Sequence, residues 1–381
     1  MIINGLHLSN FRNHINTELS FSDNINVIYG NNGAGKTSIL EAISVCSISR
    51  SFVPHSDVAL INKNAKTYTV AANCTNDFDV PYKISVSFSQ HNRKQISSNI
   101  GNNLLPKDII GEMPLIVLSP DHKDITSGSP EFRRQFVNTI LSQSSKYYLE
   151  KLFEIRKILK HRNIILQKLQ NNLDCISEFE HWTDFFINAN IEIILRRNDF
   201  ISEFNPLFVE AYRYVSESKE EVNLSYIPNS ISTKLLNDAN KEQIKEELIL
   251  KSRQLQNSEI KRATTLFGCQ KDEFRIVIND GSAREFASQG QHKSLLIALK
   301  FAEFRYLLEK RKETPIILFD DIFSELDSRR VKKVLDMLLE SSSQIFITLT
   351  EPSLIDIDKK LHKTFINIED GKNIENDKQI V

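Results

Sequence analysis

Gly30-Asn31-Asn32-Gly33-Ala34-Gly35-Lys36-Thr37 is the stretch that decides how the rest of the chain is interpreted. It matches the pattern G-x-x-x-x-G-K-[ST] of a phosphate-binding P-loop. A β-type run at 25–29 precedes it, and residues 38–43, apolar at helical spacing, follow it. A P-loop needs this order of strand, glycine-rich turn and helix. A glycine turn before an ordinary core helix is the alternative, and the Lys-Thr pair with both correct flanks disfavours it.

The motif predicts a role for each part of the loop. Its glycines allow backbone N–H groups to approach phosphate oxygens, and the helix N-terminus adds partial positive charge there. Lys36 is expected to reach the β- and γ-phosphates, and Thr37 to place its hydroxyl on Mg²⁺. The predicted nucleotide-binding residues of the loop are Gly30, Asn31, Asn32, Gly33, Ala34, Gly35, Lys36 and Thr37.

Composition excludes several classes of protein. The 381 residues are enough for roughly two domains, and the net charge of −1 gives no global attraction to nucleic acid, so any DNA contact needs a local patch. Four scattered cysteines without a C-x-x-C pair disfavour zinc and disulfides and fit a reducing compartment. The start lacks the pattern of a signal peptide, and no run approaches the ~18 apolar residues of a membrane span. We expect a soluble, cytoplasmic protein.

The chain changes character twice. Residues 1–120 are β-rich, with strands expected near 15–21, 68–74, 84–88 and 115–118. Residues 121–261 are mainly helical, and an α/β pattern returns over 262–381. The sequence therefore predicts an α/β head in two halves, 1–120 and 262–381, with a helical domain inserted at 121–261.

A short coiled-coil-like helix is expected at 147–170 of the inserted domain. Apolar residues recur there at alternating steps of three and four, and Arg162 interrupts the seam. Residues 146–168 hold seven Lys/Arg and two Glu, whereas residues 169–195 hold five acids and no Lys/Arg. The first helix could face DNA, or the two helices could pair as an antiparallel hairpin of opposite charge, which we favour. The candidate DNA contacts are Arg133, Arg134, Lys157, Lys160 and Arg162.

A second nucleotide motif lies at 316–321, where four apolar residues end in two acids. This is the form of a Walker B strand. Asp320 is expected to hold Mg²⁺ through its water shell, and Asp321 to orient the attacking water. The alternative is that both acids merely cap the next element. With Lys36, they form the predicted catalytic set.

Two further elements follow the order found in ABC-type ATPases. Ser288, Gln289, Gly290 and Gln291 precede a helix expected at 292–311, where a serine and a glycine make an anion site. In ABC-type ATPases such a signature holds the γ-phosphate of ATP bound to the other subunit. Ser324 and Asp327 match the D-loop of the class. The predicted fold class is therefore an ABC-type P-loop ATPase head with mixed sheets and an inserted helical domain.

The chain resembles the RecF family of bacterial recombinational repair ATPases over almost its whole length. Residues 8–13 are similar to the family's opening Phe-Arg-Asn element, and 118–121 with 128–134 resemble its next block. Residues 159–163 resemble its Leu-Lys-x-Arg-Asn helix. At 268–273, Cys269 and Gln270 replace the family's usual Pro and His. No histidine of the transporter switch type follows the strand that ends near residue 349.

The resemblance implies a function. RecF proteins bind ATP with Mg²⁺, form a head-to-tail homodimer around two nucleotides and bind DNA, as duplex or at gap junctions, in that state. They act with RecR and RecO to load RecA at gaps, and they are linked to the SOS response. In this arrangement Arg12 is expected to touch the nucleotide, unless it is only a solvated surface arginine. Hydrolysis is expected to be slow, because water positioning rests on Asp321 alone.

Two other classes stay open at this stage. An ABC transport ATPase would dock on a membrane protein, but the 284 positions from Lys36 to Asp320 are roughly twice what it needs. Membrane pelleting with DNA-independent hydrolysis would favour it. An SMC-like tether would need hundreds of residues of heptads, and a sizing experiment would reveal its rod.

Overall fold

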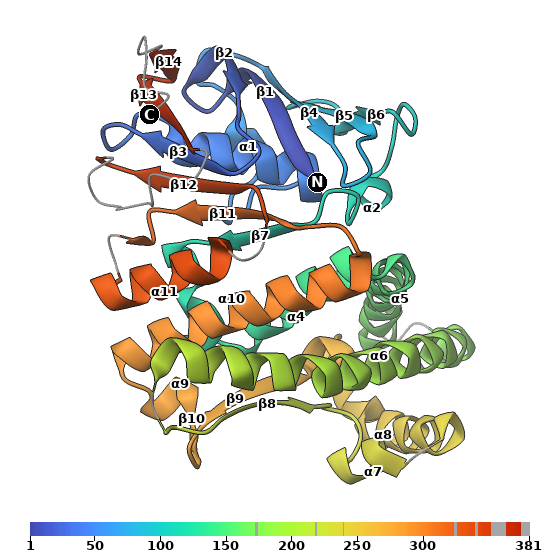
Figure 1. The fold of residues 1–381 in the computed structure, drawn as a ribbon. Helices are drawn as coiled ribbons and strands as arrows, with labels where there is room; N and C mark the ends of the chain where they lie inside the picture. The colour runs from blue at the N-terminus through green and yellow to red at the C-terminus, as the bar shows by residue number, and fades with distance from the viewer. Residues whose placement is uncertain are drawn as a thin grey trace. The chain divides into compact units, whose positions relative to one another are not determined.

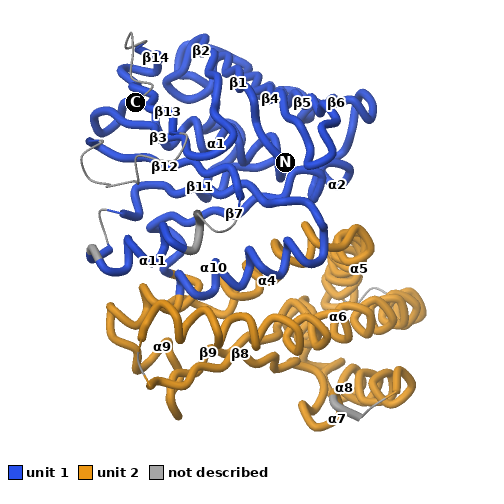
Figure 2. Tube along the Cα trace, in the orientation of Figure 1, with its two compact units in different colours: residues 1–123, 296–381 blue, residues 124–295 orange. Residues whose placement is uncertain are grey.

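The computed structural model describes residues 1–171, 174–217, 219–238, 240–323, 326–339, 342–351 and 363–374. They divide into two compact units, residues 1–123 with 296–381 and residues 124–295 (Figure 2). The sequence predicted that the inserted domain ends at residue 261, whereas the second unit ends at residue 295. The reason is that β9 (Glu273–Ile278) pairs with β8 (Val222–Ile227) inside the second unit.

The first unit is built on a six-stranded sheet in the order β14-β13-β3-β12-β11-β7 (Figure 1). Its strands are β3 (Ile25–Tyr29), β7 (Leu115–Leu118), β11 (Ile316–Asp320), β12 (Ile345–Leu349), β13 (Lys363–Glu369) and β14 (Lys372–Ile374). Neighbouring strands from β7 to β13 run parallel, and β14 forms an antiparallel hairpin with β13. The carboxyl ends of β3, β11 and β12 therefore share one edge, the usual place for a ligand in such a sheet.

A second sheet of the same unit is antiparallel, in the order β2-β1-β4-β5-β6. Its strands are β1 (Ile2–Phe11), β2 (His14–Ser20), β4 (Thr67–Thr75), β5 (Pro81–Ser89) and β6 (Gln95–Ser98). Helix α1 (Lys36–Ile48) contacts both sheets, and residues of both sheets join it in one apolar core. Eleven of its thirteen residues are buried, and they include polar residues as well as apolar ones.

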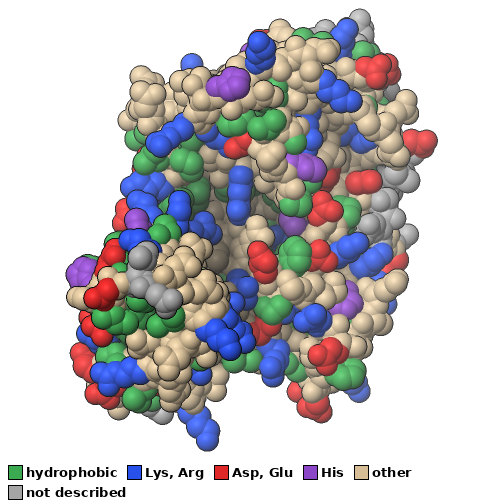
Figure 3. Space-filling model, turned by 180° about the vertical axis from the view of Figure 1, so that it is seen from behind, with side chains coloured by type: hydrophobic (Ala, Val, Ile, Leu, Met, Phe, Trp, Pro, Cys, Tyr) green, Lys and Arg blue, Asp and Glu red, His purple; other side chains and the backbone are tan. Residues whose placement is uncertain are grey.

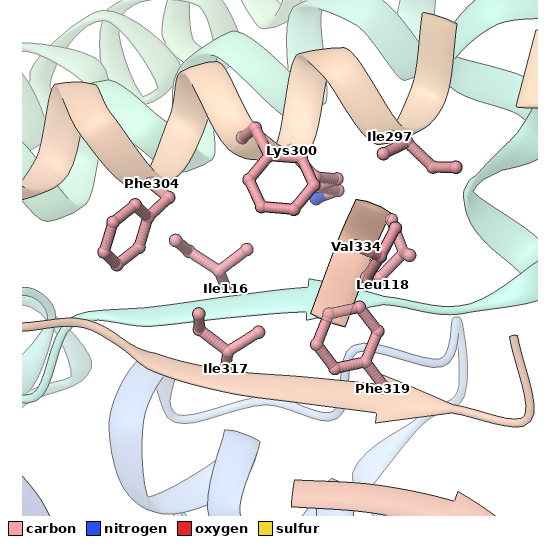
Figure 4. A pocket seen from close by; sticks show the side chains of 9 residues that line it. Ile116, Leu118, Ile297, Lys300, Phe304, Ile317, Phe319 and Val334 are labelled. Carbon is pink, nitrogen blue, oxygen red and sulfur yellow. The ribbon is translucent and has the colours of Figure 1, made fainter. Parts of the chain in front are cut away.

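Successive side chains of β11 point to opposite faces of the six-stranded sheet, and each face is covered by different helices. Ile317 and Phe319 of β11 face α10 (Gln289–Arg311) and α11 (Ser328–Leu339), as Figure 4 shows, while Ile316 and Leu318 join the core around α1. A cavity of about 20 Å³, lined by α10, α11, β7 and β11, lies on the helix side of the sheet. It has room for about one water molecule. Lys300 on its wall pairs with buried Glu303 at 2.9 Å.

The second unit is mainly helical. Its longer helices are α4 (Pro130–Ser144), α5 (Lys146–Gln170), α6 (Ile176–Ser216) and α8 (Lys241–Arg262), and its shorter ones are α3 (Asp124–Ser127), α7 (Thr233–Asp238) and α9 (Ala283–Phe286). Its sheet is β10-β9-β8, with β10 at Gly281–Ser282. Two short helices of the first unit, α2 (Pro106–Ile109) and the 3-10 helix Asp57–Leu60, and two more 3-10 turns, Pro120–Lys123 and Cys269–Lys271, complete the elements.

Helices α5 and α6 form the predicted antiparallel hairpin. Tyr147 bonds to Glu192, Arg162 to Thr183 and Lys168 to Glu178, so partner numbers fall along α6 as they rise along α5. The Lys168–Glu178 ion pair measures 3.6 Å between two half-exposed side chains, a geometry that contributes little stability. The hairpin is therefore held mainly by its buried apolar seam.

Most predicted elements of the head have their predicted type. Strand β1 was not predicted, and α10 begins at Gln289 rather than at residue 292. Basic and acidic side chains are interspersed over the face seen in Figure 3, in keeping with the near-zero net charge. Among the described residues, none of the helices combines the length and the apolar character needed to cross a membrane.

Candidate nucleotide-binding site

The P-loop connects β3 to α1 at the shared edge of the six-stranded sheet. Gly35 caps α1 with a φ of 113°, a left-handed conformation that favours glycine. Its neighbour Lys36 is buried, and its ammonium donates to the carbonyl oxygens of Gly30 at 2.7 Å and Asn31 at 2.9 Å. Burial lowers the pKa of Lys36, while Asp321 and Asp320 oppose that shift. The lysine therefore lies within the loop, as a phosphate-binding lysine should.

A cluster of polar side chains lies where β11 and β12 end. Thr37 Oγ1 donates to Asp320 Oδ1 at 2.8 Å, and Thr348 Oγ1 donates to the same oxygen at 3.0 Å. Asp320 is buried, and burial raises its pKa, although the hydrogen bonds from Thr37 and Thr348 oppose the shift. Asp320 is thus joined to the start of α1 through Thr37, and its role in holding Mg²⁺ stays a prediction. Thr348, which the sequence did not single out, completes the cluster.

Asp321 is held in an unusual conformation beside this cluster. Its φ is 49°, which is uncommon for a residue other than glycine, and its N–H donates to Thr348 Oγ1 at 2.9 Å. The side chain is exposed and lines the same cavity as Lys36. Strain of this kind concentrates at functional sites. The two acids of the Walker B strand therefore differ: Asp320 is buried and paired, and Asp321 faces the cavity.

Arg12 lies at the edge of the same cavity, bound to a buried acid. Its guanidinium binds Glu41 of α1 through two hydrogen bonds, 2.9 Å from Nε and 2.7 Å from Nη2, and Ser51 donates to the same carboxylate. Glu41 is 3% exposed and Arg12 24%. Arg12 is thus a partly buried, paired arginine on the cavity wall rather than a solvated one.

A cavity of about 700 Å³ opens over the P-loop, a size typical of small-ligand sites. Its lining comes from the P-loop and α1, the β1–β2 turn, the segment 59–64 and the ends of β11 and β12. The lining residues are Arg12, Asn13, Ile15, Asn32, Gly33, Gly35, Lys36, Thr37, Ser38, Glu41, Ala59, Ile61, Asn62, Lys63, Asn64, Asp321 and Thr348. This donor set of loop N–H groups, a lysine, a hydroxyl and carboxylates fits a nucleoside triphosphate with Mg²⁺.

The signature residues form a reciprocal cap at the start of α10, in the second unit. Gln291 N donates to Ser288 Oγ at 3.2 Å, and Ser288 N donates to Gln291 Oε1 at 2.6 Å. Ser288 and Gln289 are exposed, and Gly290 is half-buried. Gln291 also donates to Glu220 at 2.6 Å. The helix terminus therefore presents an ordered serine and glycine at the surface of this unit.

The D-loop is described only in part. Asp327 accepts from Arg330 N at 3.0 Å, ion-pairs with the Arg330 guanidinium and caps α11, and the backbone N–H of Arg330 lowers the pKa of Asp327. Ser324 lies outside the described residues. The structure thus gives Asp327 a capping role at the start of α11.

Two of the arginines predicted to contact DNA are buried. Arg162 is fully buried and donates to both carboxylate oxygens of Glu259, at 3.1 and 2.6 Å. Arg133 is 7% exposed and binds both oxygens of Glu273, at 2.9 and 3.0 Å. The prediction is wrong for both, because a guanidinium that is buried and paired with a carboxylate is not accessible to a DNA phosphate. Arg134 is half-buried, and Lys157 and Lys160 are exposed.

The loop at 268–273, which departs from the family's usual pattern, has a structural role. Asp272 is fully buried and accepts from Arg197 Nη1 at 2.6 Å and from Asn229 N at 2.9 Å. Cys269 N donates to Asn190 Oδ1 at 2.7 Å, and Gln270 Nε2 donates to the Phe267 carbonyl at 2.7 Å. Cys269 and Gln270 therefore belong to a hydrogen-bonded connection inside the second unit.

Residues 2–370 match the model of the RecF/RecN/SMC N-terminal domain. The strand order, P-loop and Walker B strand agree with that match. The SMC head domain of Pyrococcus furiosus bound to the C-terminal domain of ScpA shares the fold, with a TM-score of 0.55 at 18% identity over 98% of this chain and 95% of that one. The fold and site thus define an ABC-type P-loop ATPase head.

Relatives narrow this class to one family. The chain is 37% identical to the DNA replication and repair protein RecF of Prosthecochloris aestuarii, over 92% of this chain and 94% of the relative. It is 32% identical to the RecF of Chlorobaculum tepidum, over 98% and 99%. A solved structure of the recombination mediator protein RecF with ATP, in the RecFOR pathway, has a TM-score of 0.90 at 25% identity and 98% coverage of both chains. The chain belongs to the RecF family.

Proposed function

We propose that this protein is an ATP-dependent DNA-binding protein of recombinational repair and replication restart. The observation that carries the proposal is the 2.8 Å hydrogen bond from Thr37 to Asp320 beside Lys36, on a cavity large enough for a nucleotide. Its relatives are named DNA replication and repair proteins, and a solved relative is described with ATP.

The P-loop binds the triphosphate in this proposal. Lys36 turns from the loop carbonyls toward the β- and γ-phosphates, and the loop N–H groups face the phosphate oxygens. Thr37 and Asp320 hold Mg²⁺, which neutralises phosphate charge when bound. Asp321 orients the attacking water, and Arg12 contacts the nucleotide from the cavity wall. Hydrolysis is slow and stimulated by DNA, so ATP acts mainly as a switch.

A second copy of the chain completes each site. Ser288, Gln289, Gly290 and Gln291 at the start of α10 contact the γ-phosphate bound to the partner's P-loop, and the D-loop residues Ser324 and Asp327 lie at the same interface. ATP then gains contacts that exist only in the head-to-tail dimer, so it shifts the population toward that state. Hydrolysis removes the γ-phosphate contacts and releases the dimer.

The ATP-bound dimer binds DNA, as duplex or at gap junctions. Arg134, Lys157 and Lys160 remain the candidate contacts, since each has exposed surface. By family resemblance the dimer acts with RecR and RecO in loading RecA at gaps and in the SOS response, at the nucleoid in the bacterial cytoplasm.

Variants of two lysines test this proposal. Lys36→Met is expected to abolish binding of a fluorescent ATP analogue and ATP-dependent association with duplex DNA together. Lys83→Met, which changes an exposed lysine of β5, serves as the control and should retain both activities. ATP-dependent DNA association by Lys36→Met at the wild-type level would contradict the proposal.

A further inference from the structure

The β1–β2 turn contacts backbone carbonyls of the P-loop. Asn13 Nδ2 donates to the Ala34 carbonyl at 2.8 Å and to the Gly33 carbonyl at 3.3 Å. The amide must be oriented this way, because a carbonyl oxygen only accepts hydrogen bonds. One side chain from outside the motif therefore binds two consecutive carbonyls of the loop.

The next residue of the turn extends this contact to a third carbonyl. His14 is fully buried, and its Nε2 lies 3.1 Å from the Gly35 carbonyl oxygen, to which it donates. Its Nδ1 lies 3.0 Å from Thr17 Oγ1, which donates to the Gly371 carbonyl at 2.7 Å. The Gly35 carbonyl oxygen can only accept, so the ring hydrogen in this contact is on Nε2. Burial lowers the pKa of His14, while the hydrogen bonds with Gly35 and Gly371 oppose that shift.

The packing between turn and loop is close enough to fix the residue types. A Cβ atom at Gly35 would lie 2.7 Å from both Asn13 Oδ1 and His14 Nε2, so only glycine fits there. Gly371 N donates to the same Ala34 carbonyl at 2.9 Å. A Cβ at Gly371 would lie 2.3 Å from the Asn13 carbonyl oxygen. The turn, the loop and the β13–β14 turn thus form one tightly packed unit.

These contacts have a consequence for phosphate binding. Loop N–H groups bind phosphate only if they face the cavity, which requires the loop carbonyls to face away from it. Carbonyls turned into the protein need donors, since an unsatisfied buried acceptor is unfavourable. Resting on the proposed function, we propose that Asn13 and His14 are positioning residues for the triphosphate: they hold the carbonyls of Gly33, Ala34 and Gly35 away from the bound phosphates.

An isosteric change at Asn13 tests this role. Asn13→Asp replaces the donating amide with an oxygen that faces two carbonyls, and we expect affinity for ATP to fall roughly tenfold or more. The changed contact acts on the P-loop, which binds the phosphates. Affinity for inorganic tripolyphosphate should therefore fall by a similar factor, as measured by competition against a fluorescent ATP analogue. Asn16→Asp is the matched control, since Asn16 bonds to His7 at 2.8 Å in an exposed position of the same hairpin. It should bind both ligands about as the wild type does.

His14 offers an independent pair of variants. His14→Gln keeps an N–H donor in reach of the loop, whereas His14→Leu removes it at similar volume. Affinity for tripolyphosphate should therefore be higher in His14→Gln than in His14→Leu. Thermal unfolding without nucleotide checks that each variant is folded, and Asn13→Ser replaces Asn13→Asp if the latter does not fold.

The outcomes separate this inference from the proposed function. Wild-type affinity in Asn13→Asp would overturn the positioning role alone. Loss of ATP affinity with unchanged tripolyphosphate affinity would also overturn it, because the contact would then concern the nucleoside. A wild-type protein that binds neither ligand would overturn the proposed function itself.

Discussion

Thr37 and Asp320 lie 283 positions apart in the chain, yet a 2.8 Å hydrogen bond joins the hydroxyl of one to the carboxylate of the other. The bond connects the helix after the P-loop to the end of the Walker B strand. The fold thus brings together the two groups that are predicted to hold Mg²⁺. Such preorganisation lowers the ordering cost of binding.

Asp320→Asn is expected to stabilise the nucleotide-free protein. Burial raises the pKa of Asp320 above its value in the unfolded chain. The free energy of unfolding therefore falls as the pH rises between these two pKa values, and at pH 7 the folded state contains a destabilising buried charge. We expect the nucleotide-free Tm to rise by roughly 2 °C in the variant and the stabilisation by Mg²⁺ and ATP to disappear. Differential scanning calorimetry measures both.

Asp336→Asn, at an exposed position of α11, is the control for this experiment. It should leave the nucleotide-free Tm and the effect of Mg²⁺ and ATP unchanged. A lower nucleotide-free Tm in Asp320→Asn would show that the carboxylate stabilises the fold and would contradict the assignment.

Arg12 has a structural contact and a proposed nucleotide contact, which can be separated. Arg12→Met leaves the buried Glu41 carboxylate without its cationic partner and should cost about 2 kcal/mol of stability, the scale of a lost hydrogen bond to a charged group. Adding Glu41→Gln should recover most of that loss, because the buried charge is gone. ATP affinity should stay low in the double variant if Arg12 contacts the nucleotide, and recovery of affinity would assign Arg12 to the ion pair alone.

The buried ion pair of Arg162 and Glu259 should be a stability element. Arg162→Met leaves Glu259 buried without its partner beneath a shell of Phe179, Phe186 and Phe267, and it should cost about 3–5 kcal/mol. Urea unfolding measures the change. Measured at a temperature where the variant is folded, DNA affinity should be unchanged, and a specific loss of DNA binding would restore the prediction that the structure overturned.

Lys157 and Lys160 should contribute to DNA affinity without affecting stability. Both are exposed on α5, so their joint replacement by alanine should weaken DNA binding similarly for all sequences and reduce the salt slope by up to ~2. Fluorescence anisotropy across a salt series measures this. Lys245→Ala with Lys251→Ala, on α8, is the control pair, and an equal loss in that pair would show that α5 has no special role.

Local patterns were sufficient to predict the head of the protein. The P-loop and the Walker B strand each have a signal within a few residues, and the structure has both. Strand β1 was missed because glycine and polar residues break its alternation, and its register is fixed by pairing with β4 more than sixty residues later.

Contacts between distant segments were not predictable. Arg162 interrupts an apolar seam, which was a sign of burial, but Glu259 lies 97 residues further along and has no local signal. Glu41, the one acid of helix α1, could have indicated a partner such as Arg12. The unit boundary at 295/296 depends on the pairing of β8 with β9, which no composition shift marks.

The most direct test of the account is complementation between two inactive variants. Lys36→Met removes the P-loop half of each site, and Ser288→Arg blocks the signature half, so neither variant alone should hydrolyse ATP. In an equimolar mixture, half of the dimers are mixed and contain one complete site, so about a quarter of wild-type ATPase activity should return. Activity of Ser288→Arg alone, or no activity in the mixture, would contradict a site shared between two copies of the chain.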